Sequence, residues 1–185
     1  MSGTSGGALR SLNTPLLGLA AYSGTGKTTL LSSLIPLLND ADVQVGVIKH
    51  SHHDFEIDRP GKDSHKLRAA GARQLIVASP YRTVLIEERT PAREPNLSEL
   101  VARFDAPDLD LILVEGFRNE RFPKIELHRR EFEKPFLFPH DDSIIAVASD
   151  EPLSIALPVL DLNRPRHVCD FVLNLLSRKS TGALL

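Results

Sequence analysis

The 185-residue chain has one cysteine, one methionine, two tyrosines and no tryptophan. A single cysteine, Cys169, excludes an intrachain disulfide, and its apolar neighbours predict a small buried side chain rather than a reactive thiol. The apolar runs are too short to span a bilayer, and residues 1–13 are rich in Ser and Gly without the apolar core of a signal peptide. We therefore expect a cytoplasmic protein with no membrane partner.

The chain also lacks an excess of charge of either sign. Its formal net charge is -2, so it has no basic footprint of the kind that nucleic acid requires, and we expect no nucleic-acid partner. The length suits one domain with a sizeable core, which we expect over residues 14–179. Disordered tails are predicted at 1–13 and 180–185.

Residues 21–29 read Ala-Tyr-Ser-Gly-Thr-Gly-Lys-Thr-Thr and lie between an apolar run and a leucine-rich one. A glycine loop between a strand and a helix is the context of a phosphate-binding P-loop, whose backbone N–H groups face the phosphates. Ala21 replaces the first Gly of the usual pattern, which is tolerable where φ is negative. Lys27 is expected to reach the β- and γ-phosphates as a catalytic residue, and the Thr28 hydroxyl to ligate Mg²⁺. The predicted phosphate-binding residues are Ser23, Gly24, Thr25, Gly26, Lys27, Thr28 and Thr29.

A second motif covers residues 109–117, Leu-Asp-Leu-Ile-Leu-Val-Glu-Gly-Phe. An apolar run that ends in an acid is typical of a Walker-B strand, whose carboxylate emerges beside the magnesium of the P-loop. Glu115 is therefore predicted to serve catalysis and the metal, either directly or through water. Gly116 is predicted to lie at the ligand, where a glycine lets the backbone approach closely.

Residues 50–58 contain three histidines and three acids, directly after a predicted strand at 43–49. Three interpretations stay open. In the first, the segment is a switch-like loop in which Asp54 or Asp58 holds Mg²⁺ and a histidine meets an anion. In the second, His50, His52, His53 and Asp54 form a transition-metal site, and in the third the segment is a solvated loop.

The hydrophobic pattern predicts an α/β fold of the P-loop NTPase type, a three-layer sandwich with helices on both faces of a mostly parallel sheet. An antiparallel hairpin is expected inside that sheet, from strands at 74–79 and 83–87. Asp150 ends a late buried strand and is either an acceptor for the guanine ring or a turn residue. The other predicted strands are 14–21, 123–129, 143–149 and 159–162, and the predicted helices are 27–39, 63–70, 97–104 and 164–177.

These motifs together resemble the MobB family of molybdopterin-guanine dinucleotide biosynthesis proteins. The resemblance rests on residues 21–31, on Val-Ile-Lys-His-Ser-His-His-Asp at 47–54, on Pro-Gly-Lys-Asp-Ser at 60–64 and on residues 109–117. It implies a homodimer that binds GTP with Mg²⁺ and hydrolyses it weakly. It further implies an adapter that assists a MobA-like guanylyltransferase acting on molybdopterin to give the guanine dinucleotide.

The residues alone also allow a P-loop kinase or ligase that transfers phosphate to a small acceptor. Such an enzyme needs a lid, usually with arginines that close over the phosphates. The clustered candidates are Arg118, Arg121, Arg129 and Arg130, which follow the Walker-B strand without an obvious lid helix. We therefore favour the adapter.

Overall fold

A computed structural model describes residues 14–51, 54–104 and 108–180 of the chain. It divides into two compact units, one made of residues 1–50 and 96–185 and the other of residues 51–95. The predicted disordered tail at 1–13 lies outside the described residues, as do residues 181–185 of the tail predicted at 180–185, whereas Ser180 is described as the last residue of a helix. Within the described parts, no helix combines the length and the apolar character needed to cross a membrane.

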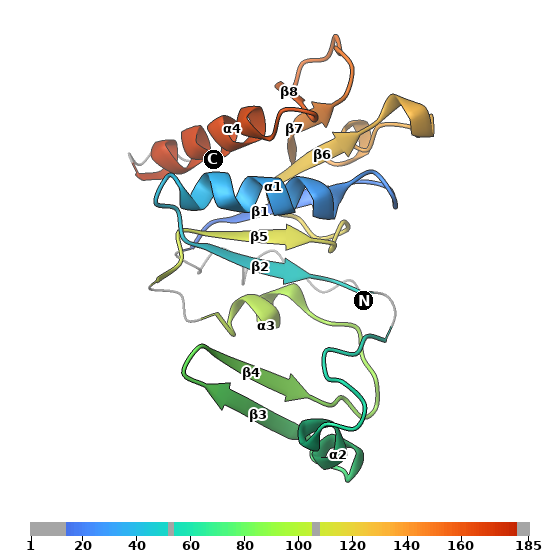
Figure 1. The fold of residues 1–185 in the computed structure, drawn as a ribbon. Coiled ribbons are helices and arrows are strands. Elements are labelled where there is room, and N and C mark those ends of the chain that lie inside the picture. The colour runs from blue at the N-terminus through green and yellow to red at the C-terminus, as the bar shows by residue number, and fades with distance from the viewer. Residues whose placement is uncertain (1–13, 52–53, 105–107, 181–185) are drawn as a thin grey trace. The chain divides into compact units, whose positions relative to one another are not determined.

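The first unit contains a six-stranded sheet in the order β2-β5-β1-β6-β7-β8, and every neighbouring pair is parallel (Figure 1). Because the P-loop strand β1 lies between β5 and β6, residues that follow either neighbour emerge beside the P-loop. The predicted strands are confirmed, with ends that differ by one or two residues. Their observed bounds are Leu16–Ala20 (β1), Val45–Lys49 (β2), Leu111–Glu115 (β5), Lys124–His128 (β6), Ile144–Ser149 (β7) and Val159–Asp161 (β8).

Helices cover both faces of this sheet. Alternate side chains of β5 separate the two layers: Leu111 and Leu113 belong to one core cluster, and Ile112 and Val114 to another. The first cluster includes buried residues of α1 (Lys27–Asn39) and α4 (Pro165–Ser180), which lie side by side in Figure 1, and the second includes α3 (Leu97–Val101). The three-layer α/β fold is confirmed.

Local signals explain several of these elements. The Asn96 side chain accepts a hydrogen bond from the backbone N–H of Glu99 and so caps α3, as Asn does at helix starts. Cys169 is buried in the core cluster of α1 and α4, as its apolar neighbours predicted. Helix α4 continues three residues beyond its predicted end.

The second unit contains helix α2 (Asp63–Ala69) and strands β3 (Gln74–Ser79) and β4 (Arg82–Glu87). The hairpin of β3 and β4 forms a sheet of its own, so the prediction that it lies inside the parallel sheet was wrong. The prediction failed because hairpin pairing is local, and local pairing does not say which sheet the pair joins. Among its described residues, 51 and 54–95, none is buried.

Strand β6 carries two buried charged residues, Lys124 and Glu126, each 1% exposed. The Lys124 ammonium donates to Asp141 Oδ2 at 2.8 Å and to Ser143 Oγ at 2.7 Å. Glu126 accepts the backbone N–H groups of Leu137 (2.8 Å) and Phe138 (2.9 Å). These bonds attach the segment between β6 and β7 to the sheet. The segment includes the 3-10 turns at Arg130–Phe132 and Phe138–His140.

Candidate functional site

The predicted P-loop connects β1 to α1 and adopts the backbone that its glycines permit. Gly24 has φ +84° and Gly26 has φ +98°, a region that L side chains rarely enter. The Tyr22 carbonyl accepts hydrogen bonds from the Thr25 hydroxyl at 2.9 Å and from Lys27 Nζ at 3.1 Å. The Thr25 side chain is therefore turned into the loop, which leaves only its backbone for a ligand.

Lys27 lies at the first turn of α1 with its ammonium drawn back over the loop. Its Nζ also donates to the Ala21 carbonyl at 3.3 Å. Partial burial lowers the pKa of Lys27, the Glu115 carboxylate opposes that lowering, and the charges of Arg118 and Lys49 add to it. A phosphate at the loop would oppose the lowering in the same way as Glu115, because an anion favours the charged form of a lysine.

Three side chains meet where β2 and β5 end and α1 begins. The Thr28 hydroxyl lies 3.1 Å from Glu115 Oε1, and Lys49 Nζ donates to Thr28 Oγ1 at 3.3 Å and lies 3.5 Å from Glu115 Oε2. Lys49 and Glu115 are directly paired residues at the ends of β2 and β5. The structure thus brings together Thr28 and Glu115, two of the three predicted metal ligands.

The chemistry of this pair suits magnesium rather than a softer metal. A hydroxyl and a carboxylate are hard oxygen donors, and Mg²⁺ usually takes only one or two protein ligands and completes its shell with phosphate oxygens and water. Across the described ranges, no group of three or more His, Cys, Asp or Glu side chains is placed to hold a metal ion. His52 and His53, which the transition-metal interpretation needs, lie outside the described residues.

Gly116 is required by a close contact that the sequence did not predict, and its position at a ligand stays a prediction. Its φ is +104°, and a Cβ added there would lie 2.6 Å from the Cβ of His50. The His50 backbone N–H donates to the Glu115 carbonyl at 2.8 Å, and the His50 ring stacks on Phe117 with centroids 4.6 Å apart. Because residue 116 has no side chain, His50 can approach it closely. This contact holds the residue after β2 against the residues after β5.

The other predicted residues lie in different surroundings. Ser23 and Thr29 are exposed on the loop and on the first turn of α1. Asp54 belongs to the second unit, where its Oδ1 accepts the backbone N–H of Phe55, so its role as a metal ligand stays a prediction. Asp58, the alternative ligand, accepts a hydrogen bond from Ser64 in the same unit.

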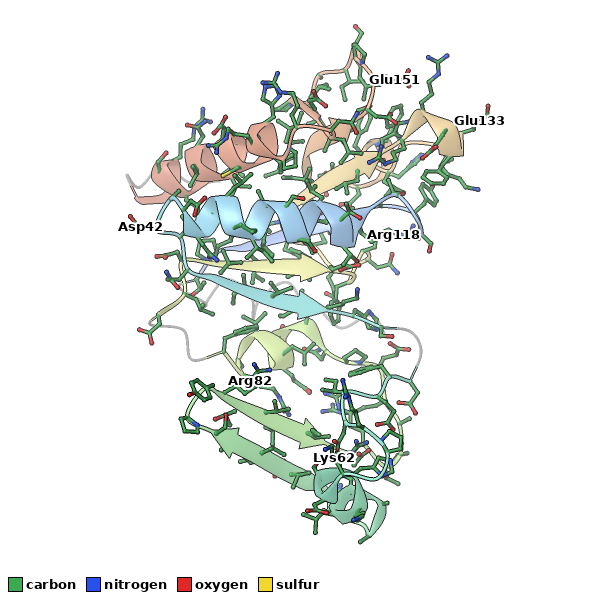
Figure 2. All side chains as sticks on the ribbon, in the orientation of Figure 1. Asp42, Lys62, Arg82, Arg118, Glu133 and Glu151 are labelled. Atoms are coloured by element: carbon green, nitrogen blue, oxygen red, sulfur yellow. The ribbon has the colours of Figure 1, made fainter. Side chains whose placement is uncertain are left out.

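The four arginines considered for a lid make separate contacts. Arg118 lies over the Tyr22 ring, 5.8 Å from its centroid, and Figure 2 shows it at the end of the sheet where α1 begins. Arg121 forms an exposed pair with Asp142, and Arg130 pairs with Glu151. Arg129 instead donates from Nε to the Thr25 carbonyl of the P-loop at 3.1 Å.

Sequence reasoning missed two of the residues that the structure places at the site. The sequence pattern predicts only a strand for Lys49, although a cation that ends an apolar strand at the P-loop edge is a usable signal. Arg129 forms a contact with Thr25 that spans 104 positions of the chain, and no local pattern predicts such a contact.

Comparisons with known proteins point to one family. The model of the family described as molybdopterin guanine dinucleotide synthesis protein B (MobB) matches residues 16–150. The molybdopterin-guanine dinucleotide biosynthesis adapter protein of Escherichia coli is 47% identical over 167 residues, which cover 90% of this chain and 95% of the relative. The protein of the same description from Haemophilus influenzae is 47% identical over 86% of this chain and 88% of its own length.

A solved structure of molybdopterin-guanine biosynthesis protein B superimposes with a TM-score of 0.69 at 26% identity. The superposition covers 88% of this chain and 99% of that one. The family match spans most of the sheet and both nucleotide motifs, and the two relatives exceed 45% identity over nearly their whole lengths. The chain therefore belongs to the MobB family.

Proposed function

We propose that this chain is an adapter in molybdopterin-guanine dinucleotide biosynthesis and that it acts by binding GTP with Mg²⁺ at the P-loop. The adapter role is supported by the names of its relatives from E. coli and H. influenzae. Nucleotide binding is supported above all by one observation: the hydroxyl of Thr28 meets the carboxylate of Glu115 at 3.1 Å, directly after a loop with the P-loop backbone.

In this proposal each residue has a stated task. The backbone N–H groups of residues 23–28 face the phosphates, and Lys27 exchanges its two loop carbonyls for the β- and γ-phosphate oxygens. Thr28 and Glu115 hold Mg²⁺, which when bound neutralises charge on the phosphates. Lys49 balances the charge of Glu115, which it approaches within 3.5 Å. Asp54 remains a candidate for a further, water-mediated metal contact.

Weak hydrolysis follows from the same set of residues. In this proposal Glu115 orients a water near the γ-phosphate, and Arg129, whose guanidinium donates to the loop backbone, comes from the end of β6 rather than from a lid. We infer that GTP turnover shifts the protein between two conformational states. We also infer that a MobA-like guanylyltransferase, which acts on molybdopterin, distinguishes those states in the cytoplasm.

We also propose that the protein is a homodimer joined through the second unit. An isolated two-stranded hairpin is marginally stable in water. Ile76 and Leu85 face each other across β3 and β4, and they are 64% and 50% exposed. A second copy would supply the apolar cover. Ile76→Asp should weaken self-association in analytical ultracentrifugation, whereas Lys66→Gln, which breaks an exposed pair in the same unit, should not.

Calorimetric titration of the purified chain with GTP and with ATP, each with Mg²⁺, tests the nucleotide proposal. We expect binding with a preference for GTP and no detectable binding by Lys27→Ala, whose circular dichroism should match the wild type. Wild-type affinity in that variant would contradict the P-loop assignment. A preference for ATP, with turnover raised by orders of magnitude by a small acceptor, would favour a kinase or ligase instead.

A further inference from the structure

The Arg129 guanidinium joins several loops at the carboxyl edge of the sheet. It follows β6 directly, and its Nε donates to the Thr25 carbonyl at 3.1 Å. Its Nη1 lies 3.6 Å from Asp150 Oδ2, after β7, and 3.5 Å from Asn163 Oδ1, after β8. The Arg129 and Asp150 side chains are 27% and 21% exposed, so water screens their attraction only partly.

This arginine lies on the opposite side of the P-loop from the proposed magnesium residues. In the sheet order, Glu115 ends β5 on one side of β1, and Arg129 follows β6 on the other. Arg129 therefore contacts the P-loop on the side of the loops after β6, β7 and β8, away from Thr28 and Glu115.

The Thr25 carbonyl is a consequential partner because of peptide geometry. In a trans peptide the C=O and the following N–H point in opposite directions. A hydrogen bond from Arg129 that fixes the Thr25 carbonyl therefore also fixes the N–H of Gly26, which has φ +98°. That N–H is one of the donors that a P-loop directs at a phosphate.

Both carboxylate oxygens of Asp150 already have partners. Oδ1 accepts the backbone N–H of Arg130 at 3.1 Å, and Oδ2 faces the Arg129 guanidinium. A carboxylate that reads guanine needs both oxygens for two N–H groups of the ring. The arrangement around Asp150 instead suits a residue that orients an arginine.

We propose that Arg129 is a positioning residue that aligns the P-loop for phosphate through the Thr25 carbonyl, and that Asp150 acts through Arg129 rather than by reading the base. This inference rests on the proposed binding of a nucleoside triphosphate at the P-loop. It assigns Asp150 a role in affinity for the triphosphate part of the ligand, which GTP, ATP and inorganic tripolyphosphate share.

Inorganic tripolyphosphate separates the two roles of Asp150, because it has phosphates and no base. We would measure the dissociation constants of Mg²⁺ complexes of GTP and tripolyphosphate for the wild type, Asp150→Asn, Arg129→Gln and the double variant. Each single change should weaken both ligands by the same factor, about tenfold, the affinity equivalent of one charge-assisted hydrogen bond. The double variant should be little weaker than Arg129→Gln, because the two residues act through one contact.

Two further variants separate positioning from folding. Arg129→Lys keeps a cation within reach of Thr25 and should retain more affinity than Arg129→Gln. Arg121→Gln breaks an exposed arginine–aspartate pair in the same unit and should leave both dissociation constants unchanged. Thermal unfolding measured beside each titration shows whether a loss of affinity comes with a loss of the fold.

The outcomes are distinct. A loss by Asp150→Asn that is confined to GTP, with tripolyphosphate unaffected, would overturn the inference and restore Asp150 as the base reader. Unchanged affinity in Arg129→Gln would overturn it as well. A wild-type chain that binds neither ligand would instead overturn the proposed function, on which the inference rests.

Discussion

The buried ammonium of Lys124 allows a sharp test of what stabilises strand β6 of the sheet. Its side chain is 2% exposed and its partner Asp141 is 23% exposed. Lys124→Met preserves the alkyl chain and removes the charge, which leaves the Asp141 carboxylate with Ser143 alone. Removing one partner of a buried ion pair usually costs 3–5 kcal/mol, so for this partly exposed partner we expect about 3 kcal/mol of unfolding free energy.

That loss is measurable in two ways. Urea unfolding followed by circular dichroism should show a lower midpoint with an unchanged slope. For a chain of this size about 3 kcal/mol corresponds to a melting temperature lower by roughly 6–12 °C. The double variant Lys124→Met, Asp141→Asn should recover part of the loss, because it no longer leaves a charged carboxylate without its cation.

The pH dependence of the Lys124 effect has a definite sign. Burial acts to raise the pKa of Asp141, but hydrogen bonds from Lys124 and Ser143 outweigh it and hold that pKa below the usual 3.8. A lowered carboxyl pKa contributes stability that is present above the unfolded pKa and disappears as pH falls through the folded one. The difference between wild type and Lys124→Met should therefore shrink in acid. A variant as stable as the wild type near neutral pH would refute the reasoning.

Three further predictions concern Glu115 and Gly116 at the site and Glu126 in β6. Glu115→Gln should keep the affinity for GTP within about tenfold of the wild-type value, roughly 1.4 kcal/mol, while it slows hydrolysis. Unchanged turnover would show that Glu115 has no part in hydrolysis. Gly116→Ala should lower the unfolding free energy by about 2 kcal/mol or more, because it combines a positive φ with a clash against His50. Gly71→Ala is the control: its φ is +107° but nothing lies within 4 Å of the added Cβ, so urea unfolding should show a smaller loss. Burial raises the pKa of Glu126 despite two opposing backbone hydrogen bonds, so the free energy of unfolding should fall as pH rises from 4.5 through the folded pKa. Glu126→Gln should abolish that pH dependence. An identical pH profile in the two proteins would contradict the role of Glu126.

The local part of the site could be predicted from the sequence. The P-loop, the start of α1 at Lys27 and the acid at the end of β5 follow from short patterns whose physics lies within one strand, loop and helix. Their meeting also followed, because parallel strands end at the same edge. The structure accordingly places Thr28 beside Glu115.

What could not be predicted depends on which strands are neighbours. Lys49 reaches Glu115 only because β2 pairs with β5, and Arg129 reaches Thr25 only because β6 lies beside β1. The buried charges of β6 contradict a hydrophobic pattern outright. Lys124 and Glu126 are tolerated because each finds hydrogen-bond partners in the excursion that follows the strand, 11 or more positions away.

The contact between His50 and Gly116 has a mechanical consequence. The second unit begins at Ser51, so a single peptide bond joins it to the residue whose ring stacks on Phe117 and whose N–H holds the Glu115 carbonyl. The residue whose Cβ lies against Gly116, one position from Glu115, is therefore also the last residue before the second unit, so the chain enters that unit from a backbone that is already fixed.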